Sequence, residues 1–193
     1  MADQYALENI DDERLARIAL CHLMPTGNEL TGTLLQDYGA VQTLRYGLGE
    51  GLPGDDQATL HVWRSHFEGY DPTEMARGVE LAEEHELRVL IPGDPDWPVG
   101  LNDIDRQAPY ALWIRGDAPE LLTRPLSERA TLIGRQGSSF RSLDNAYSLA
   151  TGLSHSEVVV VANSYPGIGR MALACTLGRP GGAIAVLPKG LDR

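Results

Sequence analysis

The sequence predicts an α/β protein in which a small helical module precedes a Rossmann-like domain with a parallel sheet. Apolar, β-branched runs at 130–134, 157–162 and 183–188 alternate with helical patterns in the second half of the chain. Strands that alternate with helices indicate βαβ units, whose strands pair in parallel through right-handed crossovers. We therefore expect the helical module over residues 1–70 and the α/β domain over residues 71–193.

Short helices account for the first 70 residues. Asp11 or Asp12 caps the first helix, which ends near the turn MPTGNE. Two more helices follow over 30–39 and 40–49, and each is closed by a glycine. The turn-rich stretch 51–57 then leads to one further helical segment.

A sharper helix start follows in the stretch YDPTEMARGVELAEEHEL. Asp71 occupies the N-cap and Pro72 the first helical position, and the apolar pattern continues to about Glu86. Two strand-like runs come next, RVLIP at 88–92 and ALWIRG at 111–116. We assign both runs to the α/β domain.

The four valines 158–161 form a strand-like run without polar alternation. Because β-branched side chains favour a pleated strand and a continuous apolar run indicates burial on both faces, we expect an inner strand here. Helical patterns at about 142–154 and 168–178 supply the covering layer. If the sheet ends at 183–188, that strand is an open edge, which invites pairing with a second copy or another protein.

Three polar loops that contain glycine follow the last three strands, with the sequences GRQGSS, NSYPGIGR and KGLDR. Because the carboxyl ends of parallel strands share one edge of a sheet, we expect these loops to meet there, beside helix N-termini that attract anions. Their guanidinium, hydroxyl, lysine and amide donors predict a phosphate site, although no spacing matches the GxGxxG or Walker A pattern. The candidate residues are Gly134, Arg135, Ser139, Arg141, Asn163, Ser164, Gly167, Arg170, Lys189 and Gly190.

Charge is distributed unevenly along the chain, whose formal net charge is -11. Residues 1–100 carry 6 Arg against 19 Asp and Glu, a balance of -13, whereas residues 101–193 carry 9 Arg and 1 Lys against 8 acids, a balance of +2. This asymmetry is compatible with nucleic acid at the C-terminal half and a basic partner at the N-terminal half. A solvated acidic face is the alternative interpretation.

Neither a cofactor nor a metal is expected. Cys21 and Cys175 are the only cysteines and lack metal-ligand spacing, which indicates a reducing, cytoplasmic setting. No apolar run approaches the length of a membrane span, so we expect no membrane contact. The acids after residue 121 have no obvious catalytic partner, so we expect no catalytic residue and no enzymatic activity.

The segment IPGDPDWPVGLNDIDRQAPYALWIRGD, residues 91–117, resembles the lead-in of the DNA-processing protein A family, also called Smf or DprA. The strand and loop ATLIGRQGSSF resemble the family's Gly-Ser-Arg loop. The stretches VVVVANSYPGIGRMAL and AIAVLPKGLDR resemble its succession of Ser-Gly, Gly-Ile-Asp, Ala-His and Gly-Leu-Asp. The first helices resemble its sterile-alpha-motif-like (SAM-like) module, so the resemblance spans almost the entire chain.

The motifs also depart from the family pattern. The positions that match are Gly134, Gly167, Ile168, Gly190, Leu191 and Asp192. The replaced positions are Arg135 and Gln136 for Ser-Arg, Ala162 and Asn163 for Ser-Gly, Gly169 for Asp, and Leu173 for His. Because the family continues beyond the last motif, we interpret the chain as a shortened, diverged relative or as a fragment.

The resemblance implies a homodimer that binds single-stranded DNA through phosphates, helps to load the recombinase RecA and performs no catalysis. Sequence-independent binding of this kind uses a positively charged groove and aromatic side chains on which the bases stack. The candidates for the groove are Arg135, Arg141, Arg170, Lys189 and Arg193, and those for base stacking are Phe140 and Tyr165.

Two other hypotheses remain open. The replaced motifs and the acidic first half fit a diverged interaction protein that contacts a full-length relative, RecA or another DNA-handling protein in place of DNA. Related Rossmann-like folds bind the phosphates of free nucleotides, which fits a nucleotide-sensing or nucleotide-processing domain.

Overall fold

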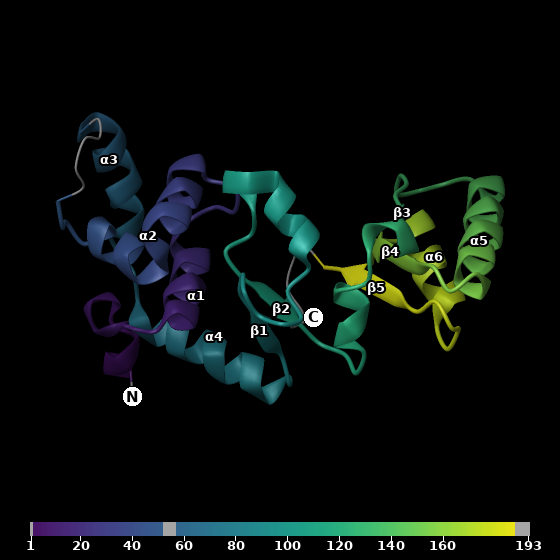
Figure 1. Cartoon of the computed structure of the whole chain (residues 1–193), viewed down its shortest axis with the longest axis horizontal. Coiled ribbons are helices and arrows are strands. Elements are labelled where there is room, and N and C mark those ends of the chain that lie inside the picture. Colours follow the sequence, from purple (N-terminus) through teal and green to yellow (C-terminus); the bar gives the residue numbers. More distant parts are fainter. Residues whose placement is uncertain (1, 52–56, 188–193) are drawn as a thin grey trace. The chain divides into compact units, whose positions relative to one another are not determined.

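The computed structural model of the chain describes residues 2–51 and 57–187. Its contacts divide the chain into two compact units, Met1–Arg115 and Gly116–Arg193, which we call the N-terminal and the C-terminal unit (Figure 1). Each unit has a hydrophobic core of its own. The division therefore falls later in the chain than the predicted boundary at residue 70.

Helices build most of the N-terminal unit. They are η1 (Ala2–Tyr5), η2 (Leu7–Asn9), α1 (Glu13–Leu23), α2 (Glu29–Gly47), α3 (Gln57–Arg64), η3 (Ser65–Phe67) and α4 (Pro72–Glu84). Two predicted caps are confirmed, because the Asp12 carboxylate accepts from the N–H of Leu15 and Asp71 accepts from the N–H of Thr73. Gly39, at φ 79°, interrupts α2, so the two short helices expected over 30–49 are confirmed as well.

A small hairpin completes the N-terminal unit. Strands β1 (Arg88–Leu90) and β2 (Leu112–Ile114) pair antiparallel, and η4 (Val99–Gln107) lies between them in the chain. By their contacts, these two runs, which we assigned to the α/β domain, belong to the N-terminal unit. Val89 and Trp113 pack against the helical core, and Tyr110 is a buried member of it, so apolar burial holds the hairpin to the helices.

The C-terminal unit is a layered α/β structure. Its elements are η5 (Pro119–Leu122), η6 (Leu126–Glu128), β3 (Arg129–Leu132), α5 (Phe140–His155), β4 (Val159–Asn163), α6 (Ile168–Thr176) and β5 (Ala183–Val186). The strands lie in the order β3-β4-β5 and pair in parallel, as predicted. Val159 and Val160 are fully buried, which confirms the inner strand.

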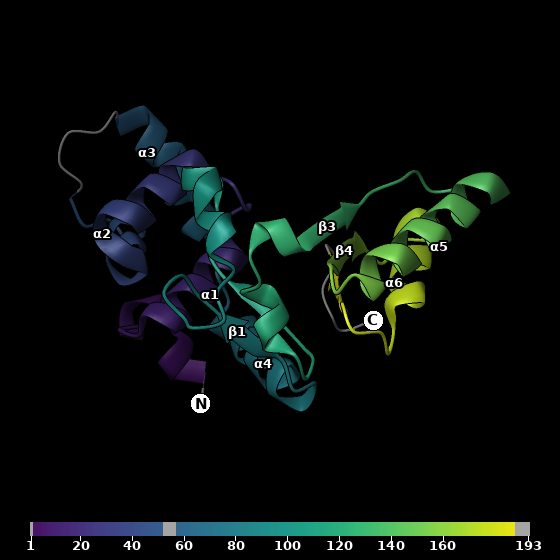
Figure 2. The ribbon, with the colours of Figure 1, turned by 45° about the vertical axis from the view of Figure 1, so that its right-hand side comes forward.

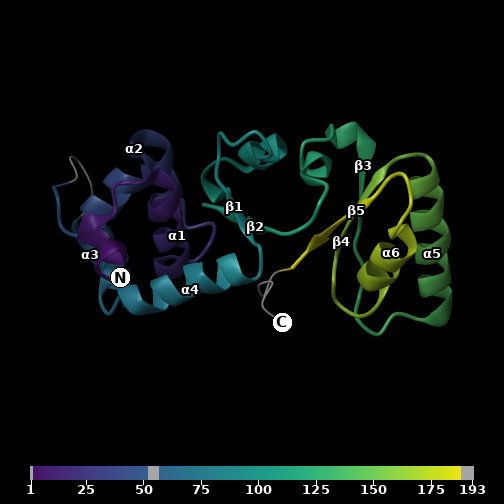
Figure 3. The same cartoon turned by 90° about the horizontal axis from the view of Figure 1, so that it is seen from below.

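Both helices of the C-terminal unit cover the same face of the sheet (Figure 3). A strand order that proceeds in one direction places successive right-handed crossovers on one side. Val160 and Ala162 accordingly pack with Ala150 of α5 and Ala172 of α6. No helix in the described part of the chain is long and apolar enough to cross a membrane.

Arg14 and Asp94 form an ion pair that further hydrogen bonds to the backbone reinforce. The guanidinium donates to both carboxylate oxygens, at 2.7 and 2.8 Å, and also to the carbonyl of Val89. The carboxylate accepts in addition from the N–H of Ile91. These contacts tie α1 to the strand β1 and the turn that follows it.

We expect Asp94→Asn to lower the free energy of unfolding of the N-terminal unit by about 1 kcal/mol at pH 7. The hydrogen bond from Arg14 lowers the pKa of Asp94 to about 2. A carboxylate with a lowered pKa stabilises the fold fully above its unfolded pKa of about 4 and loses this effect as the pH falls through the folded pKa, so the difference should vanish below about pH 2. Tryptophan fluorescence in urea titrations measures this unit selectively, because Trp63, Trp97 and Trp113 all lie in it.

Asp96→Asn is the matched control. Asp96 accepts one bond from Arg88 at 3.1 Å, and the Arg88 side chain is 52% exposed, so this pair should contribute only a few tenths of a kcal/mol. Equal losses in the two variants would contradict a special role for Asp94.

Candidate functional site

The carboxyl edge of the parallel sheet carries two adjacent loops. Residues 133–139 lead from β3 to α5, and residues 164–167 lead from β4 to α6 (Figure 2). The register pairs Leu132 with Ala162, so both strands end side by side and deliver their loops to the same place. The predicted juxtaposition of these loops is therefore present, whereas the third loop lies outside the described residues.

Two glycines allow the loops to touch. Gly167 has φ 119°, and a Cβ built on it would lie 2.9 Å from the carbonyl oxygen of Arg135 and 3.6 Å from the hydroxyl of Ser138. A Cβ on Gly134 would lie 2.3 Å from the Ile168 side chain. Any larger residue at either position forces the loops apart, so the glycines fix the shape of the edge.

The N-terminus of α6 is open to an anion. Its N-cap residue is Gly167, and no side chain caps the first turn. The first N–H groups of a helix lack intrahelical partners and carry the positive end of the helix dipole. Backbone groups, rather than side chains, are thus the main donors that this loop offers to a phosphate.

Gly169 explains one departure from the family motif. A Cβ at this position would lie 2.4 Å from the backbone oxygen and 2.5 Å from the side-chain oxygen of Asn163. The helix therefore approaches the end of β4 too closely for an aspartate. The side-chain oxygen of Asn163 accepts from the N–H of Tyr165, which makes Asn163 a support of the loop.

Three of the predicted basic side chains and both predicted aromatic ones belong to the described residues, in the two loops or in the first turns of α5 and α6. Arg135, Arg141 and Arg170 are exposed, and Nε of Arg170 donates to the carbonyl of Ser164 at 3.4 Å. Phe140, the first residue of α5, is 87% exposed, whereas Tyr165 is half-buried. An aromatic side chain that is almost entirely exposed gains nothing from the core and is free to stack on a ligand.

The Ser139 hydroxyl accepts from the N–H of Ser142, so it caps α5. Lys189, Gly190 and Arg193 lie outside the described residues. The contact residues Ser138 and Ile168 belong to the quoted motifs, but the sequence alone did not indicate that they join the two loops.

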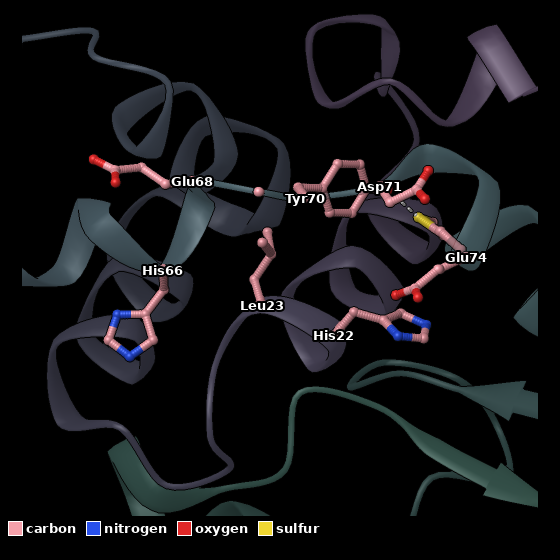
Figure 4. A pocket seen from close by; sticks show the side chains of 9 residues that line it. His22, Leu23, His66, Glu68, Tyr70, Asp71 and Glu74 are labelled. Atoms are coloured by element: carbon pink, nitrogen blue, oxygen red, sulfur yellow. Dashed lines mark hydrogen bonds between the residues drawn. The ribbon is translucent and has the colours of Figure 1, made fainter.

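A pocket of about 170 Å³ that the sequence did not indicate lies in the N-terminal unit (Figure 4). It lies between the end of α1 and the start of α4, and its lining residues are His22, Leu23, His66, Glu68, Gly69, Tyr70, Asp71, Glu74 and Met75. These residues come from two separate segments, 22–23 and 66–75, and have no motif spacing, so no signal in the sequence identified the pocket.

The pocket is lined by two histidines and by the carboxylates of Glu68, Asp71 and Glu74. Burial lowers the pKa of His22, although the nearby carboxylate of Glu74 opposes this effect. Hydrogen bonds from the hydroxyl and N–H of Thr73 lower the pKa of Asp71, and burial raises the pKa of Tyr70 to about 12. Among the described residues, no group of three or more His, Cys, Asp or Glu could hold a metal ion.

The family model for DNA recombination-mediator protein A matches residues 88–193, which is more than half of the chain. The chain belongs to this family. The match includes both strands of the hairpin, β1 and β2, and the whole C-terminal unit with its two loops. A comparison with curated proteins found no match.

A solved structure has a similar fold. DNA processing protein A (DprA) from Streptococcus pneumoniae aligns with 98% of this chain and 59% of its own, with a TM-score of 0.55 and 19% identical residues. This likeness supports the predicted architecture, a helical module followed by a Rossmann-like domain. The chain thus spans 59% of that protein's length, which is less than two thirds.

We expect Gly167→Ala to destabilise the C-terminal unit by about 2 kcal/mol, because alanine would strain the backbone and push against Arg135. Amide hydrogen exchange of the β4 peptides measures this loss. Gly152→Ala, with nothing within 4 Å inside α5, should instead stabilise slightly. Equal exchange in wild type and Gly167→Ala would contradict the tight loop contact.

Proposed function

We propose that the chain acts in DNA processing as a recombination mediator that binds single-stranded DNA. The observation that carries this proposal is the contact between the two glycine loops at the carboxyl edge of the sheet, beside the uncapped N-terminus of α6. Family membership supports the role, because the family is defined as recombination mediators. The proposed function is binding without a covalent step.

Phosphate is the part of DNA that this edge suits best. The first turn of α6 has no side-chain cap, and the exposed side chains of Arg135, Arg141 and Arg170 add positive charge on or next to the two loops. Residues 116–193 carry 8 Arg and Lys against 6 acids, so this unit does not repel a polyanion. Phe140 offers a stacking surface that accepts any base.

A different surface is proposed for protein partners. The N-terminal unit, residues 1–115, carries 21 acids against 8 Arg, so it repels DNA and attracts basic protein surfaces. We propose that a RecA-type recombinase or another DNA-handling protein contacts this unit while DNA occupies the other. We also propose that the chain works as a homodimer, in the reducing cytoplasm.

Arg135→Ala and Arg170→Ala should each weaken binding of labelled oligo-dT in fluorescence anisotropy. Each lost phosphate contact should also reduce the slope of log affinity against log salt by about 0.7. Arg179→Ala is the matched control, because it removes the same charge from a side chain that hydrogen bonds His155 beyond the far end of α6. No salt-dependent binding by wild type, or an equal loss in Arg179→Ala, would overturn the proposal.

Phe140→Ala should reduce affinity for oligo-dT by about 1–3 kcal/mol without changing the salt slope, because stacking involves no counterion release. Leu149→Ala removes a 52% exposed apolar side chain from the same helix and should have no effect. The same anisotropy titration at two salt concentrations separates the two kinds of contact. Unchanged affinity in Phe140→Ala would exclude base stacking at this residue.

A further inference from the structure

A second hollow lies next to the pocket of Figure 4 in the N-terminal unit. It has a volume of about 410 Å³, lies between the start of α2 and the helix α3, and is lined mostly by apolar groups. His66 lines both cavities, so they are adjacent, and we call them the apolar hollow and the acidic pocket. The size of the apolar hollow falls within the range of about 300–1,000 Å³ that is typical of binding clefts.

The apolar hollow combines a fixed wall with an exposed apolar side chain. Trp63 is 3% exposed, and its indole N–H donates to the hydroxyl of Thr31 at 2.9 Å. Val62, which also lines the hollow, is 65% exposed. A partner that covers Val62 removes apolar surface from water, and the fixed wall needs little reorganisation to receive it.

The carboxylates of the acidic pocket have no ion-pair partner in the described part of the chain. Glu68, Asp71 and Glu74 line the pocket, and none of the ion pairs formed by described residues includes them. Glu68 lies on the His66 side of the pocket and Glu74 on the His22 side (Figure 4). A cation that enters is therefore attracted from both sides and displaces no arginine.

Charge and apolar surface together select the class of partner. The N-terminal unit carries 21 acids against 8 Arg, so it repels DNA and anionic lipid surfaces. Among the described residues no cluster could hold a metal ion, and a small cation would leave the apolar hollow empty. A protein segment that bears basic and apolar side chains close together matches both cavities at once.

We propose that the N-terminal unit docks a basic amphipathic segment of a partner protein. An apolar side chain of this segment occupies the apolar hollow against Val62, and a neighbouring arginine or lysine enters the acidic pocket between Glu68 and Glu74. This inference rests on the protein partner proposed above for this unit and is independent of DNA binding.

Fluorescence anisotropy of labelled peptides with the full chain tests the proposal. An amphipathic helical peptide of leucine and arginine should bind, and its affinity should fall as salt is added. A peptide with glutamate in place of arginine should not bind. A peptide with serine in place of leucine should bind about 10-fold more weakly, because it cannot fill the apolar hollow.

Matched valine variants locate the apolar contact. Val62→Ser should raise the Kd of the leucine–arginine peptide by about 10-fold, because the peptide then buries less apolar surface. Val99→Ser is the control, because Val99 is 71% exposed in the same unit but lines neither cavity. Its Kd should equal that of wild type.

Matched glutamate variants locate the basic contact. Glu68→Gln/Glu74→Gln should raise the Kd by about 3- to 10-fold and weaken its salt dependence. Glu80→Gln/Glu83→Gln removes the same charge from exposed positions farther along α4 and should have little effect. Circular dichroism and thermal melting show that each variant is folded.

Three results would overturn the docking surface. The first is an absence of binding by the leucine–arginine peptide, and the second is an equal loss in the control variants, which would assign the attraction to the overall charge of the unit. The third is self-association of wild type that Val62→Ser abolishes in sedimentation velocity, which would make a second copy the occupant. The oligo-dT titrations test DNA binding separately, so either proposal can fail without the other.

Discussion

The close approach of α6 to the ends of β3 and β4 is the constraint on which the C-terminal unit depends. It exists because Gly134, Gly167 and Gly169 present no Cβ to Ile168, Arg135 and Asn163, respectively. The approach in turn brings two loops together and leaves the first turn of α6 without a side-chain cap. The central strand β4 supports both loops rigidly, because the side chains of Val159 and Val160 are fully buried and closely packed.

The two units are stabilised in different ways. The N-terminal unit relies on a large apolar core, to which the hairpin is held by Trp113 and by the ion pair of Arg14 with Asp94. The C-terminal unit has a smaller core made largely of alanine and valine, which lets its helices approach the sheet closely. The two units that the contacts define also carry net charges of opposite sign, and these charges suit different classes of partner.

The departures from the family motif have a common physical character. Ala162 and Leu173 lie in or against the core beneath the edge, and Gly169 accommodates Asn163. The replaced side chains would have supplied polar groups, whereas the present residues supply packing and leave the donors to the backbone and to exposed arginines. We propose that such an edge still attracts phosphate, because helix N-terminal amides attract anions whatever their side chains are.

The sequence by itself determined the helix caps at Asp12 and Asp71, the parallel βαβ units and the inner valine strand, since these follow from local spacing and apolar periodicity. The resemblance of residues 91–117 also identified the family. The tertiary structure alone decided that the hairpin joins the helices and that Gly167 meets Arg135. Strand runs of similar composition pack against whichever apolar surface lies within reach, and contacts between distant residues have no local pattern from which they can be read.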